Sequence, residues 1–279
     1  MRSLPPPELT SAQVVAACAA SIRDPDLSGR LTAVAGRLTQ AEADYQLHGT
    51  GMSLFRIQPS NGVGGQVASA EMMRIYASTF VRSVRTRAMY DALKAAPDND
   101  VCPLCAQRTV STLDHYLAQS IHSELVITPY NLIPSCAECN KSKLDHQPVS
   151  EVDQGFHPYF DHFDDQHWLV AEVVEGVPAA LRFAVIAPVD WPPVKSERAV
   201  AHFASLRLGE LYASHSGVEL ANIRYSLQRV ADAGTAQDVR AYLEDRAEST
   251  RHAYPNGWQA AMYRALADSD WFCAGGFRA

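Results

Sequence analysis

Two Cys-x-x-Cys pairs constrain this chain more than any other feature. They lie within one short stretch, as Cys102/Cys105 and Cys136/Cys139. Each pair can turn two thiolates toward one ion, and two pairs complete the closed tetrahedral site typical of structural zinc. The other two cysteines lie far away and no signal peptide is recognisable, so a disulfide framework is disfavoured. We therefore predict a small module stapled by Zn²⁺ in a cytoplasmic protein.

Polar residues between and beside the pairs are not needed for a metal staple. Asp114 and His115 are adjacent, Asn131 follows them, and Asn140 comes directly after the last cysteine. The segment TVSTLDHY favours a strand that ends in Asp-His, and ITPYNLIPSC favours a second strand. A helix is expected to start near Cys139, so the predicted order is strand, loop, strand, helix.

This arrangement resembles the HNH endonuclease family, whose module has a ββα-metal fold, in a His-Asn-Asn variant formed by His115, Asn131 and Asn140. The resemblance covers Cys102 to His146 and is carried by C-x2-C, DH, N and C-x2-C-N-x2-K in this order. One departure is visible, because alanine and glutamine follow DHYL where many relatives have proline and lysine.

The resemblance implies a role for each of these residues. His115 would be the general base that deprotonates the attacking water, and Asn131 would orient it. Asp114 and Asn140 would hold a divalent cation, Mg²⁺ or Mn²⁺, through oxygen atoms. For Asn140, capping of the helix that follows is the alternative. Lys143 would contact the DNA backbone, although exposure to solvent is an equally good interpretation of a single helical lysine. The implied products are a 5′-phosphate and a 3′-hydroxyl.

A basic stripe precedes the module. We expect one helix over 70–95, with Met73, Tyr76, Phe80, Val84 and Leu93 on its apolar face. It also carries five cations, of which Arg82 and Arg85 are candidates for phosphate contacts; a solvated charged face is the alternative. The net charge of −7 is unusual for an autonomous nucleic-acid binder. Either the basic residues are locally concentrated, or a regulatory partner, such as an ATPase subunit, supplies part of the binding to DNA.

The predicted fold class is α+β and mostly helical, in three parts: a helical region 1–98, the module 99–147, and a mostly helical region 148–279 with a strand pair. Helices are expected at 11–22, capped by Thr10 or Ser11, and at 28–45, and a glycine-rich loop at 49–68. In the last region we expect strands in HWLVAEVV and ALRFAVIA, and a helix capped by Ser196 with Val200 turned inward. A helix marked by Val218 follows, then one opened by Thr235 and Asp238, then one from Trp258 to Ala267. No run is long enough to span a membrane.

The favoured function is a metal-dependent endonuclease that cuts DNA, in genome defence against viruses or in a mobile element. One alternative is a non-catalytic zinc module that binds DNA or protein; another is an RNA-directed or partner-gated nuclease. A second metal site at His157 and His162 is disfavoured, and His146 is expected on the surface. Tyr159, Phe160 and Trp168 are expected in the core.

Overall fold

The chain divides into two compact units. The structure is a computed structural model that describes residues 1–143, 145–164 and 166–278. The first unit is Arg2–His162, and the second is Phe163–Ala279 together with Met1. The candidate site residues all lie in the first unit, so its construction matters most here.

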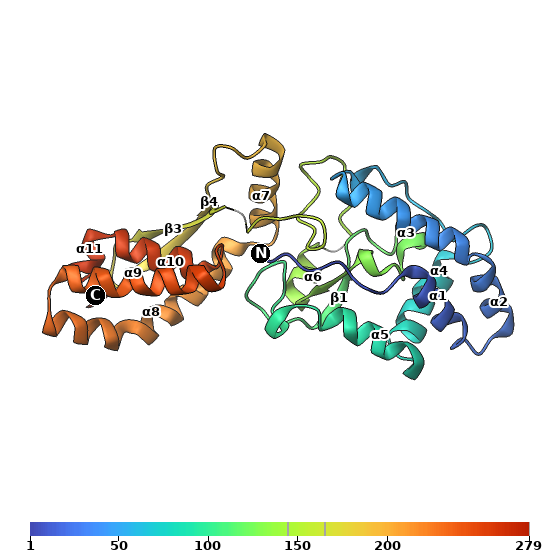
Figure 1. The fold of residues 1–279 in the computed structure, drawn as a ribbon, viewed down its shortest axis with the longest axis horizontal. Coiled ribbons are helices and arrows are strands. Elements are labelled where there is room, and N and C mark those ends of the chain that lie inside the picture. The colour runs from blue at the N-terminus through green and yellow to red at the C-terminus, as the bar shows by residue number, and fades with distance from the viewer. Residues whose placement is uncertain (144, 165, 279) are drawn as a thin grey trace. The chain divides into compact units, whose positions relative to one another are not determined.

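The first unit begins with a set of short helices (Figure 1). They are α1 (Ser11–Ala19), α2 (Pro25–Ala33), α3 (Ala35–Thr50), α4 (Ser69–Arg74) and α5 (Val84–Lys94). Thr10 caps α1, as expected, because its side chain accepts a hydrogen bond from the Gln13 amide. The expected helix at 28–45 is in fact two helices that meet at Val34. The segment 49–68 is mainly loop, as expected, with one short 3₁₀ turn.

The single helix expected over 70–95 is wrong. After α4 the chain widens into a π-helical segment, Ile75–Phe80, and α5 starts only at Val84. The buried Thr86 hydroxyl holds this break, because it donates to carbonyl oxygens of the preceding turn, including Thr79 at 2.6 Å. A π turn and a break both shift the helical register. Val84, expected on the apolar face, is consequently 93% exposed.

A small strand–loop–strand–helix unit follows the helices. Strand β1 (Thr112–His115) pairs antiparallel with β2 (Leu132–Ser135), with Thr112 opposite Ser135 and His115 opposite Leu132. Helix α6 (Ala137–Lys143) starts directly after the second strand. Leu113, Val126, Ile127 and Leu132 join one hydrophobic core with residues of α1 to α5. The 99–147 segment therefore does not stand alone but shares its core with the N-terminal helices.

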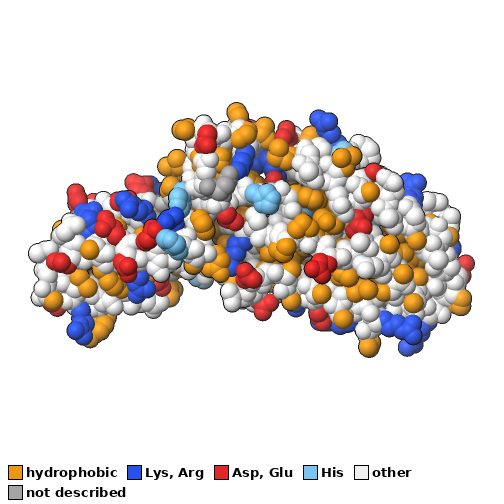
Figure 2. All heavy atoms as spheres, in the orientation of Figure 1, with side chains coloured by type: hydrophobic (Ala, Val, Ile, Leu, Met, Phe, Trp, Pro, Cys, Tyr) orange, Lys and Arg blue, Asp and Glu red, His pale blue; other side chains and the backbone are white. Residues whose placement is uncertain are grey.

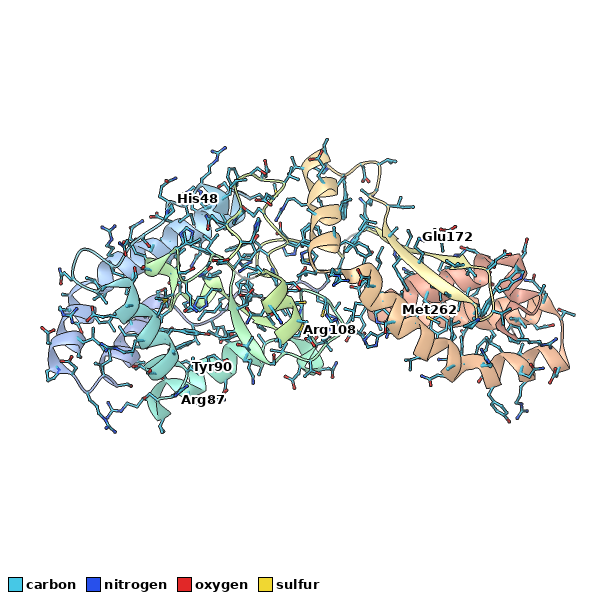
Figure 3. The ribbon with its side chains drawn as sticks, turned by 180° about the vertical axis from the view of Figure 1, so that it is seen from behind. His48, Arg87, Tyr90, Arg108, Glu172 and Met262 are labelled. Atoms are coloured by element: carbon cyan, nitrogen blue, oxygen red, sulfur yellow. The ribbon has the colours of Figure 1, made fainter. Side chains whose placement is uncertain are left out.

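The second unit is a strand pair with helices. Strands β3 (Leu169–Val174) and β4 (Ala180–Val185) are antiparallel, which confirms the expected pair. The helices are α7 (Pro193–Ser205), α8 (Leu208–Ala233), α9 (Ala236–Ala253), α10 (Trp258–Asp268) and α11 (Asp270–Cys273). Helix α10 packs on β3 and α9, and its Met262 is fully buried (Figure 3).

The predicted helix starts and apolar helix faces in this unit are confirmed only in part. The capping box of Thr235 and Asp238 is confirmed, since the Asp238 carboxylate accepts from the Thr235 amide at 2.7 Å. The cap assigned to Ser196 is wrong: α7 begins at Pro193, because proline fits the first helical position. Val200 and Val218 are exposed rather than inward-facing, whereas Leu211, Ile223 and Leu227, expected on the same apolar faces, are buried. Within the described part of the chain, no helix is long and apolar enough to cross a membrane.

Helix α3 offers a matched test of the first unit's core. Leu38 is 1% exposed and belongs to the core, whereas Leu47 on the same helix is 72% exposed. We predict that Leu38→Ala lowers the free energy of unfolding by about 2–5 kcal/mol through lost burial and a residual cavity. Leu47→Ala should change it by less than about 0.5 kcal/mol. Urea denaturation followed by circular dichroism measures both; equal effects would contradict this core.

Candidate functional site

Four buried cysteines form the first part of the site. Cys102, Cys105, Cys136 and Cys139 bring their sulfur atoms within 4.8 Å of one another. In a tetrahedral zinc site with Zn–S bonds of about 2.3 Å, the sulfurs lie about 3.8 Å apart. The cluster therefore fits a metal ion such as zinc, as the two Cys-x-x-Cys pairs predicted.

Backbone amides support the sulfurs at both turns. The Arg108 N–H donates to Cys105 Sγ, and the Cys139 N–H donates to Cys136 Sγ, each at 3.4 Å. Such bonds stabilise thiolates by placing partial positive charge beside them. Because all four side chains are thiols of one chain, the site is closed and leaves no position for a substrate.

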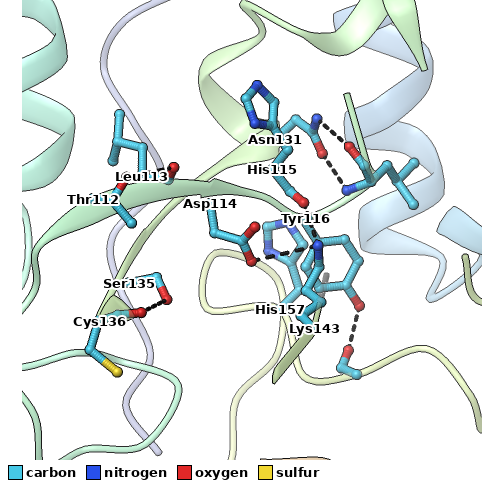
Figure 4. Close-up of polar contacts among 12 residues, drawn as sticks. Thr112, Leu113, Asp114, His115, Tyr116, Asn131, Ser135, Cys136, Lys143 and His157 are labelled. Carbon is cyan, nitrogen blue, oxygen red and sulfur yellow. Dashed lines mark hydrogen bonds and ion pairs between the residues drawn. The ribbon is translucent and has the colours of Figure 1, made fainter. Parts of the chain in front are cut away.

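Asp114 and His115 end β1 and point to opposite sides of it (Figure 4). Successive side chains of a strand alternate between its two faces, so adjacent residues cannot share one face. Asp114 extends toward α6, and the His115 ring extends toward the N-terminal helices. The two groups flank the end of the strand rather than forming one cluster.

The His115 imidazole is buried and neutral. Its Nε2 lies 2.8 Å from the carbonyl oxygen of Val126, which can only accept, so Nε2 carries the proton. The ring also packs edge-on against Tyr76, with 4.6 Å between ring centres. Burial lowers the pKa of His115 to about 4, and the charge of Lys143 acts in the same direction. The lone pair is then on Nδ1, which makes this nitrogen the one able to accept a proton.

Lys143 faces Asp114 on the other side of the strand. Its Nζ lies 3.5 Å from Asp114 Oδ2 and also donates to the carbonyl oxygen of His115. Burial raises the pKa of Asp114 to about 6, although the lysine charge opposes this shift. Solvent exposure was one interpretation of Lys143, but its side chain is mostly buried. The Lys143 ammonium thus lies beside the Asp114 carboxylate, which sequence analysis proposed as a ligand of a divalent cation.

Asn131 fastens the loop between the two strands. Its Oδ1 accepts from the Leu117 amide at 2.7 Å, and its Nδ2 donates to the carbonyl oxygens of Leu117 and Leu125. Leu125 precedes Val126, whose carbonyl oxygen binds the His115 ring. The amide of Asn131 therefore positions the loop that orients His115, in agreement with the role expected for it.

Asn140 lies in the middle of α6, because the helix begins at Ala137. The competing possibility that Asn140 caps this helix is therefore wrong. It stands three residues before Lys143, so the two side chains share one face of the helix. Its side chain is partly exposed.

The two arginines assigned to DNA lie at the start of α5. Arg82 and Arg85 are exposed, and Arg85 donates to the carbonyl oxygen of Ala20 at 2.9 Å. Arg87, farther along the same helix, instead pairs with Asp91 and lies over the Tyr90 ring (Figure 3). Of the five cations of the predicted stripe, Arg74 ends α4, Arg82 lies just before α5, and three lie on α5. Of those three, Arg87 is neutralised by Asp91.

The remaining histidines take structural positions. His146 is exposed and pairs with Asp153 at 3.0 Å, as expected for a surface residue. His157 is fully buried and bonds to the Tyr45 hydroxyl at 3.0 Å and the Tyr159 amide at 3.2 Å. Among the described residues, the four cysteines are the one group placed to hold a metal through at least three Cys, His, Asp or Glu side chains. Tyr159 and Trp168 are buried as expected, whereas Phe160 is only half-buried.

One neighbour of His115 was not predicted from the sequence. Tyr76 packs on the imidazole, and its hydroxyl lies 3.4 Å from the carbonyl oxygen of Leu113. Sequence analysis predicted for Tyr76 only a position on an apolar helical face. The contact arises from tertiary packing of the π-helical segment on β1, for which no local sequence signal exists.

The cluster yields a prediction on metal content. Cys139→Ser should remove the metal, because a neutral hydroxyl is a poor replacement for a thiolate ligand. We expect loss of one zinc per chain and at least about 3 kcal/mol of stability, or about 6–12 °C in melting temperature. Mass-spectrometric metal analysis and thermal melting measure these effects. Cys18→Ala, which alters a buried thiol outside the cluster, should retain the metal; zinc retained by Cys139→Ser would refute the assignment.

The hydrogen bonds of Asn131 lead to a prediction about stability. Asn131→Ala leaves one buried amide and two buried carbonyl groups without their partner, so it should cost about 2–4 kcal/mol. Asn140→Ala, at a partly exposed position of the same module, should cost less than about 0.5 kcal/mol. Chemical denaturation compares the two variants. An Asn131→Ala protein as stable as wild type would show that the loop does not depend on this amide.

Comparisons with known proteins give one full-length relative. The chain is 26% identical over 296 residues to protein ea31 of Escherichia phage lambda, a match that covers 99% of this chain and 100% of that protein. No family model matches the chain. No solved structure matches it either.

Proposed function

We propose that this chain is a metal-dependent endonuclease of the HNH type that hydrolyses DNA phosphodiester bonds. The observation that carries the proposal is the strand–loop–strand–helix order, with Asp114 and His115 ending β1 beside a four-cysteine cluster. A zinc staple alone needs neither this Asp-His pair nor an asparagine that fixes the loop around it.

His115 is the proposed general base. Its neutral ring and the proton on Nε2 support this role, because Nδ1 is then free to take a proton from water. Asn131 acts through the loop and positions the imidazole rather than contacting substrate. Attack by the activated water on phosphorus would leave a 5′-phosphate and a 3′-hydroxyl.

Asp114 and Asn140 are the proposed ligands of a catalytic cation, Mg²⁺ or Mn²⁺. One carboxylate and one amide oxygen suit a hard cation that keeps several of its waters. Such an ion, when bound, supplies stabilisation of negative charge on the transition state and on the departing oxygen. Lys143 now neutralises Asp114, and once released from that pair its ammonium can contact a phosphate oxygen. The four cysteines would hold Zn²⁺ in a purely structural role.

The burial of His115 supports a gated form of this activity. The ring is 7% exposed and is covered by Tyr76, so a scissile phosphate reaches it only after the 75–80 segment moves. A partner protein, such as an ATPase subunit, is one way to drive this movement. The phage origin of the relative accords with a mobile-element setting, and the cytoplasm would be the place of action.

A non-catalytic adaptor is the second candidate. The contacts of His115 with Val126 and of Asp114 with Lys143 are also those of a purely structural strand end. In that case the zinc module would only bind DNA or a protein, and cleavage would not occur with any metal or partner. An RNA-directed nuclease is a further alternative that substrate competition separates from the first.

Cleavage of plasmid DNA tests the main proposal. We predict nicking by the pure protein, or by its complex with the neighbouring gene product, in Mg²⁺ or Mn²⁺. His115→Ala should lower the rate by at least about 100-fold, the usual contribution of a general base. His146→Ala, which removes an exposed histidine of the same module, should retain wild-type rates.

The outcomes separate the candidates. Activity only with the partner identifies the gated nuclease, and faster cleavage of RNA than of DNA identifies the RNA-directed enzyme. DNA binding without cleavage under every metal and partner condition favours the adaptor. Equal cleavage by wild type and His115→Ala would remove the imidazole from the mechanism.

A further inference from the structure

An open pocket lies between α1, α2 and the start of α5, away from the cysteine cluster. It has a volume of about 850 Å³ and is enclosed by the 20–24 turn, residues of the π-helical segment, and 82–85. All of these segments belong to the first unit, so the pocket is formed within one compact body. Its size exceeds that of a single phosphate and is in the range of sites for larger ligands.

The pocket is strongly basic. Arg23, Arg74, Arg82 and Arg85 line it, against one acidic residue, Asp24. Figure 2 shows Lys and Arg side chains gathered around the outer end of α5. Such a cluster is notable in a chain whose net charge is −7.

The arginine charges are available to a ligand. Within the described residues, Arg23, Arg74 and Arg82 have no salt bridge, and Arg85 gives one N–H to the Ala20 carbonyl oxygen. The carboxylate one turn before Arg74 is already engaged, because Glu71 is bound by the Arg30 guanidinium at 2.8 Å. Like charges held together without partners repel, and a bound anion relieves this repulsion.

The neutral part of the lining also suits phosphate. Ser21, Ser78, Thr79 and Ser83 supply hydroxyl groups, which can donate to phosphate oxygens. Among the residues that the structure describes, no aromatic side chain lines the pocket, so it offers no platform on which a nucleobase could stack. The chemistry thus favours phosphate groups over bases.

We propose that this pocket binds the phosphates of a nucleic-acid backbone, without reading its sequence. The identity of the ligand as a polynucleotide rests on the proposed nuclease function. The pocket adds Arg23 and Arg74 to Arg82 and Arg85, and it gathers them from three separate parts of the chain. It would hold substrate at a distance from the scissile bond and give affinity that depends strongly on salt.

The pocket shares a structural element with the candidate catalytic residue. Ile75, Ser78 and Thr79 of the π-helical segment line the pocket, while Tyr76 of the same segment covers His115. A strand bound in the pocket therefore contacts the element that must move to expose the imidazole. Because of this proximity, the pocket is proposed to act in substrate binding and not merely to contribute positive charge to the surface.

Charge reversal tests the proposal. Arg74→Glu/Arg82→Glu should weaken binding of a short labelled duplex by about tenfold or more, and flatten the slope of log Kd against log salt by about 1.8, because two phosphate contacts are lost. Arg56→Glu, at an exposed arginine of the same unit outside this pocket, is the matched control and should change Kd less than about twofold. Fluorescence anisotropy without added divalent cation measures binding while cleavage is prevented, and thermal melting verifies folding.

Several results would overturn the proposal. One is a double variant whose Kd and salt slope match those of Arg56→Glu. Another is a pair of findings: ATP saturates the pocket in calorimetry, and the double variant binds the duplex as tightly as wild type does. Together they would identify a site for free nucleotides. The binding assay is independent of catalysis. Binding that depends on the pocket, without any cleavage, would support the proposed phosphate site and contradict the proposed nuclease function.

Discussion

Four sulfur atoms held within 4.8 Å of one another constrain everything around the candidate site. They join the segment before β1 to the turn between β2 and α6, so the strand pair, with only four residues in each strand, is fixed at its Thr112–Ser135 end. A two-stranded sheet of this length is marginal in water without such support. A bound ion would compensate for the short strands, and the packing of Leu113 and Leu132 into the helical core provides the rest.

This construction assigns different surroundings to the two faces of β1. The face of Asp114 looks toward α6 and the lysine that neutralises it, whereas the face of His115 looks toward the helices and Tyr76. Because adjacent residues on a strand cannot share a face, a phosphate approached by both groups has to sit at the strand end. Under the proposed nuclease function, the packing of Tyr76 on His115 would be the main structural barrier to a reactive arrangement.

The sequence was most informative where a local chemical rule decides the structure. The cysteine spacing predicted the cluster, and the caps at Thr10 and Thr235 follow from side-chain oxygens that bond nearby amides. The order of strand, loop, strand and helix around Asp114 and Asn131 was likewise predicted, because the local sequence carries strand and helix signals. The roles assigned to these residues are still predictions.

What the sequence could not give depends on contacts between distant segments. The π-helical break before Val84 depends on the bonds of Thr86, which no periodicity reveals. The contact of Tyr76 with His115 and the meeting of Arg23 with Arg74 require the packed helices. Local secondary-structure propensity carries no information about contacts between distant segments. The residues that surround a motif are therefore harder to predict than the motif itself.

The acidic net charge and the basic pocket are compatible once distance is considered. Charges in water at physiological salt are screened over about 8 Å, so most carboxylates of the chain contribute little inside a pocket lined by four arginines. Elsewhere on the surface, the excess of acidic residues opposes indiscriminate association with nucleic acid. Affinity would then come from a few close contacts rather than from the whole surface. In such a protein, the geometry of one pocket decides whether a polyanion is held, and a partner that brings the polyanion close would have a large effect.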